Sequence, residues 1–517
     1  MKSIKLDKYI NDVNLYISII FLLIALLPIF KFDYVVADNA RAFLYQGSNK
    51  FDTFLNCFLH RVPFDILTGR PLVSVIGECH EAYLVNKLED LYYLRYASFA
   101  FVCINMIYLS KIFENTDLEN YKYFIGAVFL LSPGYFYMVN LGVNGLPAQF
   151  ALLLSIKSFL FYQKIEKKFD TNFIFSGVAF IIANLIFPAF AFFSIILILV
   201  DIFLSKKIEK NTLIFSIKKI VFFIFCAFIY FMIAKFLKLF LNYVFDYHTH
   251  ASMQPSYEFS VNTNILQIFN KIKIFFSYKF LLNEISYNDI HYKYPTLGLD
   301  LISLCIINLI IYKKINFYNL NSSFFKILII FSISIVLILG SISPWLFSNS
   351  SYITPHYFLP TFILTPICFF LVLEKLKIKK LFIFSFLFLL VIFFNISFLK
   401  TSKFMTLGDT FIKNEVRRFF YEKHHLKYSR ILVITKGYLH EEALGVLMAS
   451  LKDDYIKSLS KEKSFVFCPL NDKNCLLKNN DRIIINIVTK KDEFKENLKN
   501  IFVIDLTEVL ASKNSTL

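Results

Sequence analysis

A small group of polar and charged residues follows the first apolar segment of the chain, residues 14–31. This group contains Asp38, Asn39 and Arg41. A carboxylate at the depth of lipid headgroups can act as a general base, and an arginine there can hold a phosphate through two parallel hydrogen bonds. The alternative is structural: Asp38 and Asn39 cap a helix, and Arg41 extends to the headgroups. Both interpretations place the group at a membrane surface, because residues 41–62 predict an amphipathic helix lying along it.

A second group, Gly69-Arg70-Pro71-Leu72, lies further along the same connection. Glycine before Arg-Pro predicts a turn, and proline suits the first position of a helix. Arg70 would then lie beside the free N–H groups of a helix N-terminus, and the two together make a phosphate site. The alternative is an ordinary turn that carries a surface arginine.

The composition indicates an integral membrane protein. Of the 517 residues, 57% are hydrophobic and only 18% are charged, and the mean hydropathy is +0.57. A soluble domain of this size carries more charge. The net charge of +17 does not indicate a nucleic-acid partner, because the lysines gather in short gaps between apolar runs, as cytoplasmic connections do. Two such gaps hold Lys206, Lys207, Lys210, Lys218 and Lys219, and Lys375, Lys377, Lys379 and Lys380.

Apolar runs near the length of a bilayer crossing predict an α-helical polytopic membrane protein with about eleven transmembrane helices. The run at 173–204 is counted as two crossings, because basic segments flank it on both sides and Pro188 favours a break. The basic N-terminus has no cleavage site after its apolar run, so we expect a retained first helix. The expected spans are 14–31, 95–111, 123–139, 145–162, 173–187, 189–204, 220–241, 297–312, 325–341, 357–373 and 380–398.

The placement of lysines sets the expected orientation and domain organisation. The N-terminus is expected in the cytoplasm, and the long connections 32–94 and 242–296 outside. Residues 1–399 form the membrane domain, and residues 400–517 form a small extracytoplasmic α/β domain. Within it, strands are expected at 429–435, 464–469, 481–489 and 500–506, and a helix at 440–459.

The eight cysteines fall into two sets. Cys103, Cys226, Cys305 and Cys368 lie in expected helices, where cysteine acts as a small core hydrophobe. Two further pairs lie in segments assigned to the outside, where disulfides persist. These candidate disulfides are Cys57–Cys79 and Cys468–Cys475, with free thiols as the alternative.

The two motifs together resemble those of the membrane glucosyltransferases that decorate bacterial O-antigens, the type II glucosyltransferase family of the GT-C class. The residues that carry the resemblance are Asp38, Asn39, Arg41, Gly69, Arg70, Pro71 and Leu72. The helical plan with a large first outside connection agrees with it. One position departs, because that family typically has two adjacent acids and this chain has Asn39 as the second. A divalent cation is the cofactor that two adjacent acids would hold, and the departure puts such a cation in doubt.

The resemblance implies a reaction and a place for it. The donor would be a hexose such as glucose on undecaprenyl phosphate, and the acceptor an envelope glycan at the outer face of a bacterial inner membrane. Asp38 would be the general base, Asn39 would contact the sugar, and Arg41 and Arg70 would bind the phosphate. A single displacement would invert the anomeric centre.

The second large outside connection, 242–296, offers further candidates. His-x-His spacing beside acids permits a metal cluster, but no three-ligand zinc motif is complete, so polar contact with sugar or an interfacial aromatic loop stays open. The residues concerned are Asp246, His248, His250 and Glu258. Lys271, Lys273 and Lys279 lie on an amphipathic stretch that could meet lipid phosphate.

The last outside connection supplies two more substrate-binding candidates. Trp345 and Tyr352 suit sugar stacking and equally suit anchoring at the membrane interface. His356 lies where a helix re-enters the membrane, near the expected phosphate plane.

Three other functions remain open. An O-antigen polymerase shares the many helices and the large outside loop. A lipid-linked glycan transporter should show charges inside its helices or inverted repeats, and the expected helices carry few charges, namely Lys157, Lys235 and Lys238. A scaffold that binds a partner through its tail would not need so many helices.

Overall fold

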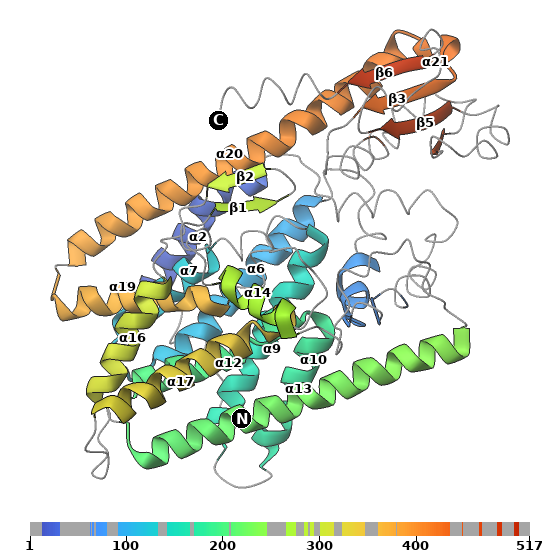
Figure 1. The fold of residues 1–517 in the computed structure, drawn as a ribbon. Coiled ribbons are helices and arrows are strands. Elements are labelled where there is room, and N and C mark those ends of the chain that lie inside the picture. The colour runs from blue at the N-terminus through green and yellow to red at the C-terminus, as the bar shows by residue number, and fades with distance from the viewer. Residues whose placement is uncertain are drawn as a thin grey trace.

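A computed structural model gives the fold of the chain (Figure 1). The residues that it describes are 13–31, 63, 65–66, 69–79, 91–132, 142–165, 170–205, 208–245, 265–275, 284–287, 290–293, 300–314, 323–346, 360–378, 380–434, 447, 465–467, 483–488 and 501–505.

Helices dominate the described part of the chain. The α-helices are α2 (Val13–Lys31), α6 (Leu91–Ser110), α7 (Lys122–Leu130), α9 (Gly142–Gln163), α10 (Thr171–Ile186), α11 (Pro188–Ala191), α12 (Phe193–Leu204), α13 (Lys210–Phe245), α14 (Ile265–Phe275), α16 (Asp300–Lys314), α17 (Ser323–Ser341), α18 (Ser343–Leu346), α19 (Leu364–Lys375), α20 (Lys380–Tyr421) and α21 (His424–Lys427). A π-helix, η1 (Ser74–Glu78), and two 3-10 helices, η3 (Lys111–Phe113) and η4 (Glu119–Tyr121), accompany them.

Several of these helices are suited to a membrane. Within the described residues, four helical segments are long and apolar enough to cross one: Val13–Lys31, Leu91–Phe113, Gly145–Gln163 and Asn211–Leu241. Shorter apolar helices lie at Thr171–Ile186, Pro188–Leu204, Ile327–Ser341 and Phe382–Ile396. The expected membrane class is therefore supported, whereas the expected number of about eleven crossings is not confirmed. The expected span 123–139 begins as α7, which ends at Leu130.

Helices α9 and α10 run in opposite directions. The hydroxyl of Ser158 in α9 donates to the carbonyl of Ser176 in α10 over 2.7 Å. At the end of α9, Asn172 donates to the carbonyl of Lys164. The later residue on the α9 side thus contacts the earlier residue on the α10 side, so the two helices are antiparallel.

The apolar run 173–204 reverses direction, as expected from its flanking lysines. Helix α10 ends before Phe187, and Pro188 opens α11 at its first position. Helix α12 then runs parallel to α9, because Ser155 contacts Ser194 and Gln163 donates to Asp201. Helices α10 and α12 are thus antiparallel, and the prediction of two helices with a break at proline is confirmed.

The lysine-rich connections gather at one end of the helical bundle, which we call the lysine end. Three contacts between segments distant in sequence define it: Asn14 with Asn120 over 3.3 Å, Asp117 with Lys375 over 3.9 Å, and Ile208 with Lys314 over 3.1 Å. All of these residues flank connections that the charge pattern assigned to one side of the membrane. The opposite end, which we call the turn end, holds the C-terminus of α2 and the start of α6, where Arg95 donates to the carbonyl of Ile29.

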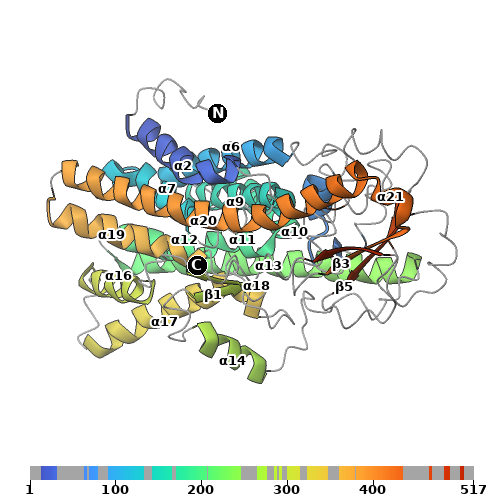
Figure 2. The same cartoon turned by 90° about the horizontal axis from the view of Figure 1, so that it is seen from above.

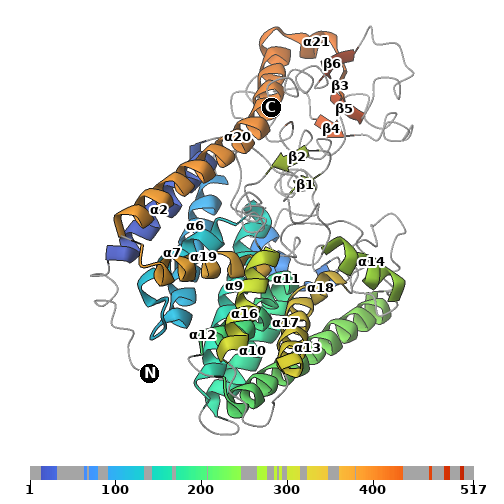
Figure 3. The same cartoon turned by 60° about the vertical axis from the view of Figure 1, so that its left-hand side comes forward.

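Helix α20 joins the bundle to a sheet beyond the turn end (Figures 1 and 3). Its 42 residues correspond to about 63 Å at 1.5 Å per residue, roughly twice the thickness of a bilayer core. The first half packs on α2, where Asn395 donates to the carbonyl of Ile24. Seen from above, α20 continues past the bundle to α21 and the sheet (Figure 2).

The sheet consists of the four strands that the sequence predicts. They are β3 (Arg430–Ile434), β4 (Phe465–Phe467), β5 (Ile483–Val488) and β6 (Ile501–Asp505), all parallel and in the order β4-β5-β3-β6. The last strand packs back on α20, since the Phe419 and Phe502 rings lie 4.9 Å apart. Helix α20 runs through residue 400, so one helix belongs to both the bundle and the sheet unit. A separate hairpin pairs β1 (Glu284–Tyr287) with β2 (Ile290–Lys293).

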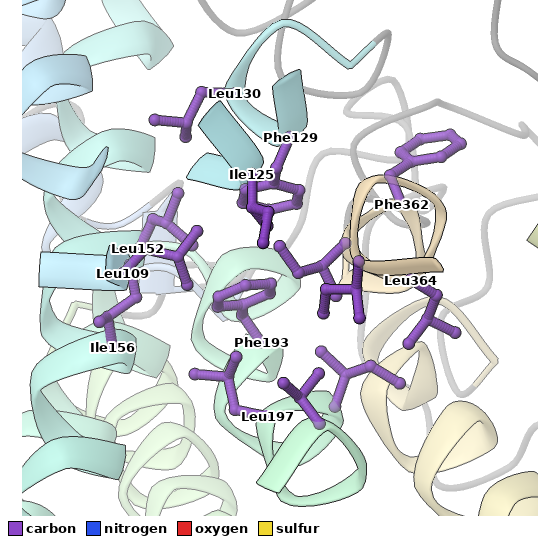
Figure 4. Close-up of a cluster of buried hydrophobic side chains, with 14 of the residues drawn as sticks. Leu109, Ile125, Phe129, Leu130, Leu152, Ile156, Phe193, Leu197, Phe362 and Leu364 are labelled. Atoms are coloured by element: carbon purple, nitrogen blue, oxygen red, sulfur yellow. The ribbon is translucent and has the colours of Figure 1, made fainter. Parts of the chain in front are cut away.

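Aromatic and branched side chains fill the core of the bundle (Figure 4). Phe129 of α7 stacks on Phe193 of α12, with ring centroids 5.0 Å apart. Leu109, Leu152 and Ile156 lie nearby, all fully buried. This dry layer fixes the relative positions of α6, α7, α9 and α12. Two of these helices, α6 and α9, carry polar groups considered below.

The cysteines follow the expectation in part. Cys226 and Cys368 are buried, as expected of core residues, whereas Cys305 is exposed and so is not the core residue that was expected. Cys79 is disulfide-bonded. The expected partner Cys57 lies outside the described residues, as do Cys468 and Cys475.

Candidate functional site

The Gly69-Arg70-Pro71 segment forms the expected turn. The Gly69 amide donates to the carbonyl of Ile66, and the Arg70 amide donates to the carbonyl of Asp65 over 2.8 Å. Gly69 has φ +75°, a conformation that residues with a side chain rarely adopt. The Tyr230 hydroxyl of α13 donates to the Gly69 carbonyl over 2.7 Å. A methyl group at position 69 would lie 3.2 Å from that hydroxyl, so a side chain there would be both strained and crowded.

The turn is also fixed to the end of α10, and this changes one expectation. The Leu72 amide donates to the Leu185 carbonyl over 3.1 Å, and the Val73 amide donates to the Arg70 carbonyl over 3.0 Å. These N–H groups were expected to be free for a phosphate, but they are used in anchoring the turn. The following helix is a five-residue π-helix, which is too short for a N-terminal anion site. A helix thus begins close to the expected place, but it starts after Pro71 and Leu72 rather than at Pro71. Arg70 itself is the cationic group of the turn.

The side chain of Arg70 lies over an aromatic ring. Its guanidinium carbon is 5.2 Å from the centroid of Phe187, the residue between α10 and α11. A guanidinium over a ring face gains a cation–π attraction. The side chain is half-buried, so a positive charge is held at a defined place on the turn end.

Three buried carboxamide side chains lie near the height of Leu185, the residue of α10 on which this turn is anchored. Gln149 lies nine residues before Ser158 in α9, and Leu185 lies nine residues after Ser176 in α10. Because Ser158 and Ser176 are paired in these antiparallel helices, Gln149 is level with Leu185, the residue that accepts from the turn. Asn184 is adjacent to Leu185 on α10. Asn105 of α6 adjoins Gln149, because it donates to the Gln149 main-chain carbonyl over 3.1 Å.

These carboxamides keep polar atoms without a hydrogen-bond partner among the described residues. Both side-chain polar atoms of Gln149 have none, and neither does the side-chain oxygen of Asn105 or of Asn184. All three residues are fully buried. A buried polar group without a partner costs about 1–3 kcal/mol, so each such group in a folded protein calls for an explanation, such as a bound water, ion or ligand.

A buried arginine fixes the end of α2, from which the chain leads to Asp38. The Arg95 guanidinium donates to the Ile29 carbonyl over 3.1 Å and is only 4% exposed. Phe30 stacks on Tyr96 with ring centroids 5.0 Å apart. The last turn of α2 is thus held by α6, and the residues after it start from a fixed point.

Helix α14 brings a lysine to the turn end. Lys271 is 8% exposed, and burial lowers its pKa to about 8. Leu266 and Phe269 on the same helix are exposed, whereas Ile272 packs on the core. Helix α14 contacts α18, which in turn contacts α11 beside Phe187. The expectation that this stretch is amphipathic holds, with a lysine on its buried face.

The other predicted site residues lie mostly outside the described part of the chain. Asp38, Asn39, Arg41 and His356 lie there, as does Tyr352. Trp345 is placed on the short helix α18. Among the described residues no group of three or more His, Cys, Asp or Glu could hold a metal ion. The acids and histidines of 246–258 lie outside them.

Sequence reasoning missed several residues of this end. Gln149, Asn105 and Asn184 were visible as single carboxamides within apolar runs, a pattern that indicates function or interhelical bonding in membrane helices. The role of Tyr230 had no such signal, because its contact with Gly69 joins residues far apart in sequence. The Arg70 turn thus offers one cation, and the three helices offer unused polar atoms near the level at which the turn is anchored.

Comparisons with known proteins give no further identification. No family model matches the chain, and neither a curated protein nor a solved structure matches it. The motifs and the arrangement of the turn end are therefore what indicates the function.

Proposed function

We propose that the protein is a membrane glycosyltransferase of GT-C type. It moves a sugar, a hexose such as glucose, from undecaprenyl phosphate to an envelope glycan at the outer face of a bacterial inner membrane. The observation that supports this proposal is that the Arg70 turn and the C-terminus of α2 both lie toward the end of the bundle opposite the lysine end. The Arg70 turn is anchored on α10 and α13 there, and α2 ends there and leads into the Asp38-Asn39-Ala40-Arg41 segment.

In the proposed reaction, Asp38 accepts the proton of an acceptor hydroxyl. The hydroxyl oxygen attacks the anomeric carbon, and the bond from that carbon to the phosphate oxygen breaks. Lipid phosphate leaves with the bonding electrons, and Arg41 and Arg70 stabilise its charge. The anomeric centre inverts. Asn39 contributes a hydrogen bond to sugar, so the reaction needs no second acid at that position.

The orientation forms part of the proposal. The lysine end faces the cytoplasm with the N-terminus, in accordance with the positive-inside rule. The turn end and the sheet unit then face the periplasm or the exterior. This orientation suits a donor whose phosphate lies at the outer headgroup plane.

Replacement of Asp38 tests the proposal in cells. Asp38→Asn and Asp38→Ala are compared with the parent protein by glycan mass, with membrane levels checked by immunoblot. The matched control is Asp117→Asn at the lysine end, where Asp117 is exposed and paired with Lys375. We expect a hexose increment with the parent and the control, and none with either Asp38 variant. An increment that persists in both Asp38 variants would assign Asp38 to a helix cap.

One observation favours a second candidate, a lipid-linked glycan transporter. Lys219 is 1% exposed and pairs with Asp201, which is 31% exposed, over 2.5 Å between α12 and α13. Charged residues that pair within membrane helices can mark transport pathways. A fluorescent lipid-linked glycan in proteoliposomes separates the candidates. Transport without transfer, lost in Lys219→Met, would favour the transporter.

A further inference from the structure

The three carboxamides at the level of the Arg70 turn have no role in the proposed reaction as stated. They come from three different helices, α6, α9 and α10, and all are fully buried. Membrane helices commonly satisfy such groups by bonds to each other. Here the side-chain amide of Asn105 donates to the Gln149 carbonyl over 3.1 Å, and that of Asn184 donates to the Phe180 carbonyl over 2.8 Å. Their oxygens stay without partners among the described residues.

Gln149 has the larger unused capacity. Its side chain offers an acceptor oxygen and a donor amide, and neither forms a hydrogen bond within the described part of the chain. It follows Pro147 in the first half of α9, and η1, the π-helix after Arg70, packs on α9. π-Helical segments occur frequently at functional sites. Gln149 thus lies on α9 at the level where the Arg70 turn is anchored on α10.

We propose that Gln149, with Asn105 and Asn184, binds the hydroxyl groups of the sugar whose phosphate Arg70 holds. This inference rests on the proposed function and adds the site of the donor's sugar to it. A pyranose presents hydroxyls that both donate and accept, which a carboxamide matches with both kinds of group. Placing these beside Arg70 lets one ligand contact the cation through its phosphate and the carboxamides through its sugar.

The arrangement predicts that different residues recognise the phosphate and the sugar of the donor. Arg70 should recognise any polyprenyl phosphate, with or without sugar. Gln149 should recognise only the form that carries sugar. A purely structural carboxamide would affect both forms equally or neither.

Binding of paired lipids to the purified full chain in nanodiscs tests this division without turnover. Native mass spectrometry gives Kd for undecaprenyl phosphate and for its forms carrying glucose, galactose or mannose. We expect the parent to bind at least one sugar-bearing form at least tenfold more tightly than the bare lipid. Gln149→Leu should reduce that ratio to within twofold and leave the Kd for bare lipid unchanged. The matched control is Gln163→Leu, on the same helix at the lysine end, where Gln163 donates to Asp201.

Each outcome decides the inference. A parent that binds all four lipids equally overturns it, as does a Gln149→Leu variant that keeps the tenfold ratio. Equal loss of affinity for bare and sugar-bearing lipid in that variant also overturns it, because it indicates a structural role. Melting temperature provides a second measurement: removal of a buried unpartnered amide should maintain or raise it. If the ratio behaves as expected but no sugar is transferred, the inference stands and the proposed transferase activity fails.

Discussion

The anchoring of the Arg70 turn predicts a measurable coupling between Gly69 and Tyr230. Tyr230→Phe removes the hydroxyl and leaves the buried Gly69 carbonyl without its 2.7 Å donor, at a cost of about 1–3 kcal/mol. Gly69→Ala forces a side chain into φ +75°, at a cost of about 1–2 kcal/mol. It also places a methyl group 3.2 Å from the Tyr230 oxygen. In the double variant that contact is gone, so its destabilisation should fall short of the sum by about 1 kcal/mol.

Unfolding in mixed micelles with a rising fraction of SDS gives the free energy for each variant. Tyr243→Phe, on the same helix and 91% exposed, should leave it unchanged. Binding of bare polyprenyl phosphate should weaken in Gly69→Ala, because Arg70 moves with the turn. Additive single effects, within about 0.5 kcal/mol, would refute the argument that the hydroxyl and position 69 are in contact.

Three further predictions concern other parts of the molecule. Burial lowers the pKa of Lys271 from 10.5 to about 8, so the unfolded chain binds an extra proton between these values and stability rises with pH there. Lys271→Met should reduce this rise in melting temperature, and Lys273→Met should not. Lys219→Met should lower the unfolding free energy by about 2–3 kcal/mol. Adding Asp201→Asn to this variant should restore part of the lost free energy. Cys79→Ser should destabilise the protein by about 2–4 kcal/mol. The unfolding free energy of the parent with its disulfide reduced provides the comparison.

Much of the fold was predictable from local pattern. The strands β3, β4, β5 and β6 were predicted from short apolar runs rich in β-branched residues. The reversal within 173–204 was predicted from the charge on both sides and from Pro188. These features depend on neighbouring residues, which a single sequence displays.

Features that depend on distant residues were not predictable. The length of α20 beyond its apolar half depends on packing against α2 and β6, and the helix crosses the expected domain boundary. The N–H groups after Arg70 are used because Leu185 happens to lie beside Leu72. Arg95 was overlooked because its role depends on the end of α2, far away in sequence.

The measurement that tests the central claim most directly is transfer by the purified chain. The protein in nanodiscs receives undecaprenyl phosphate carrying a labelled hexose, with extracted envelope glycan as acceptor. Labelled glycan and released lipid phosphate are then quantified. The account predicts equal amounts of both products with the parent, and a rate lower by about 10²–10⁴-fold in Asp38→Asn. An Asp38→Asn variant as fast as the parent, or a parent that releases no lipid phosphate, would contradict it.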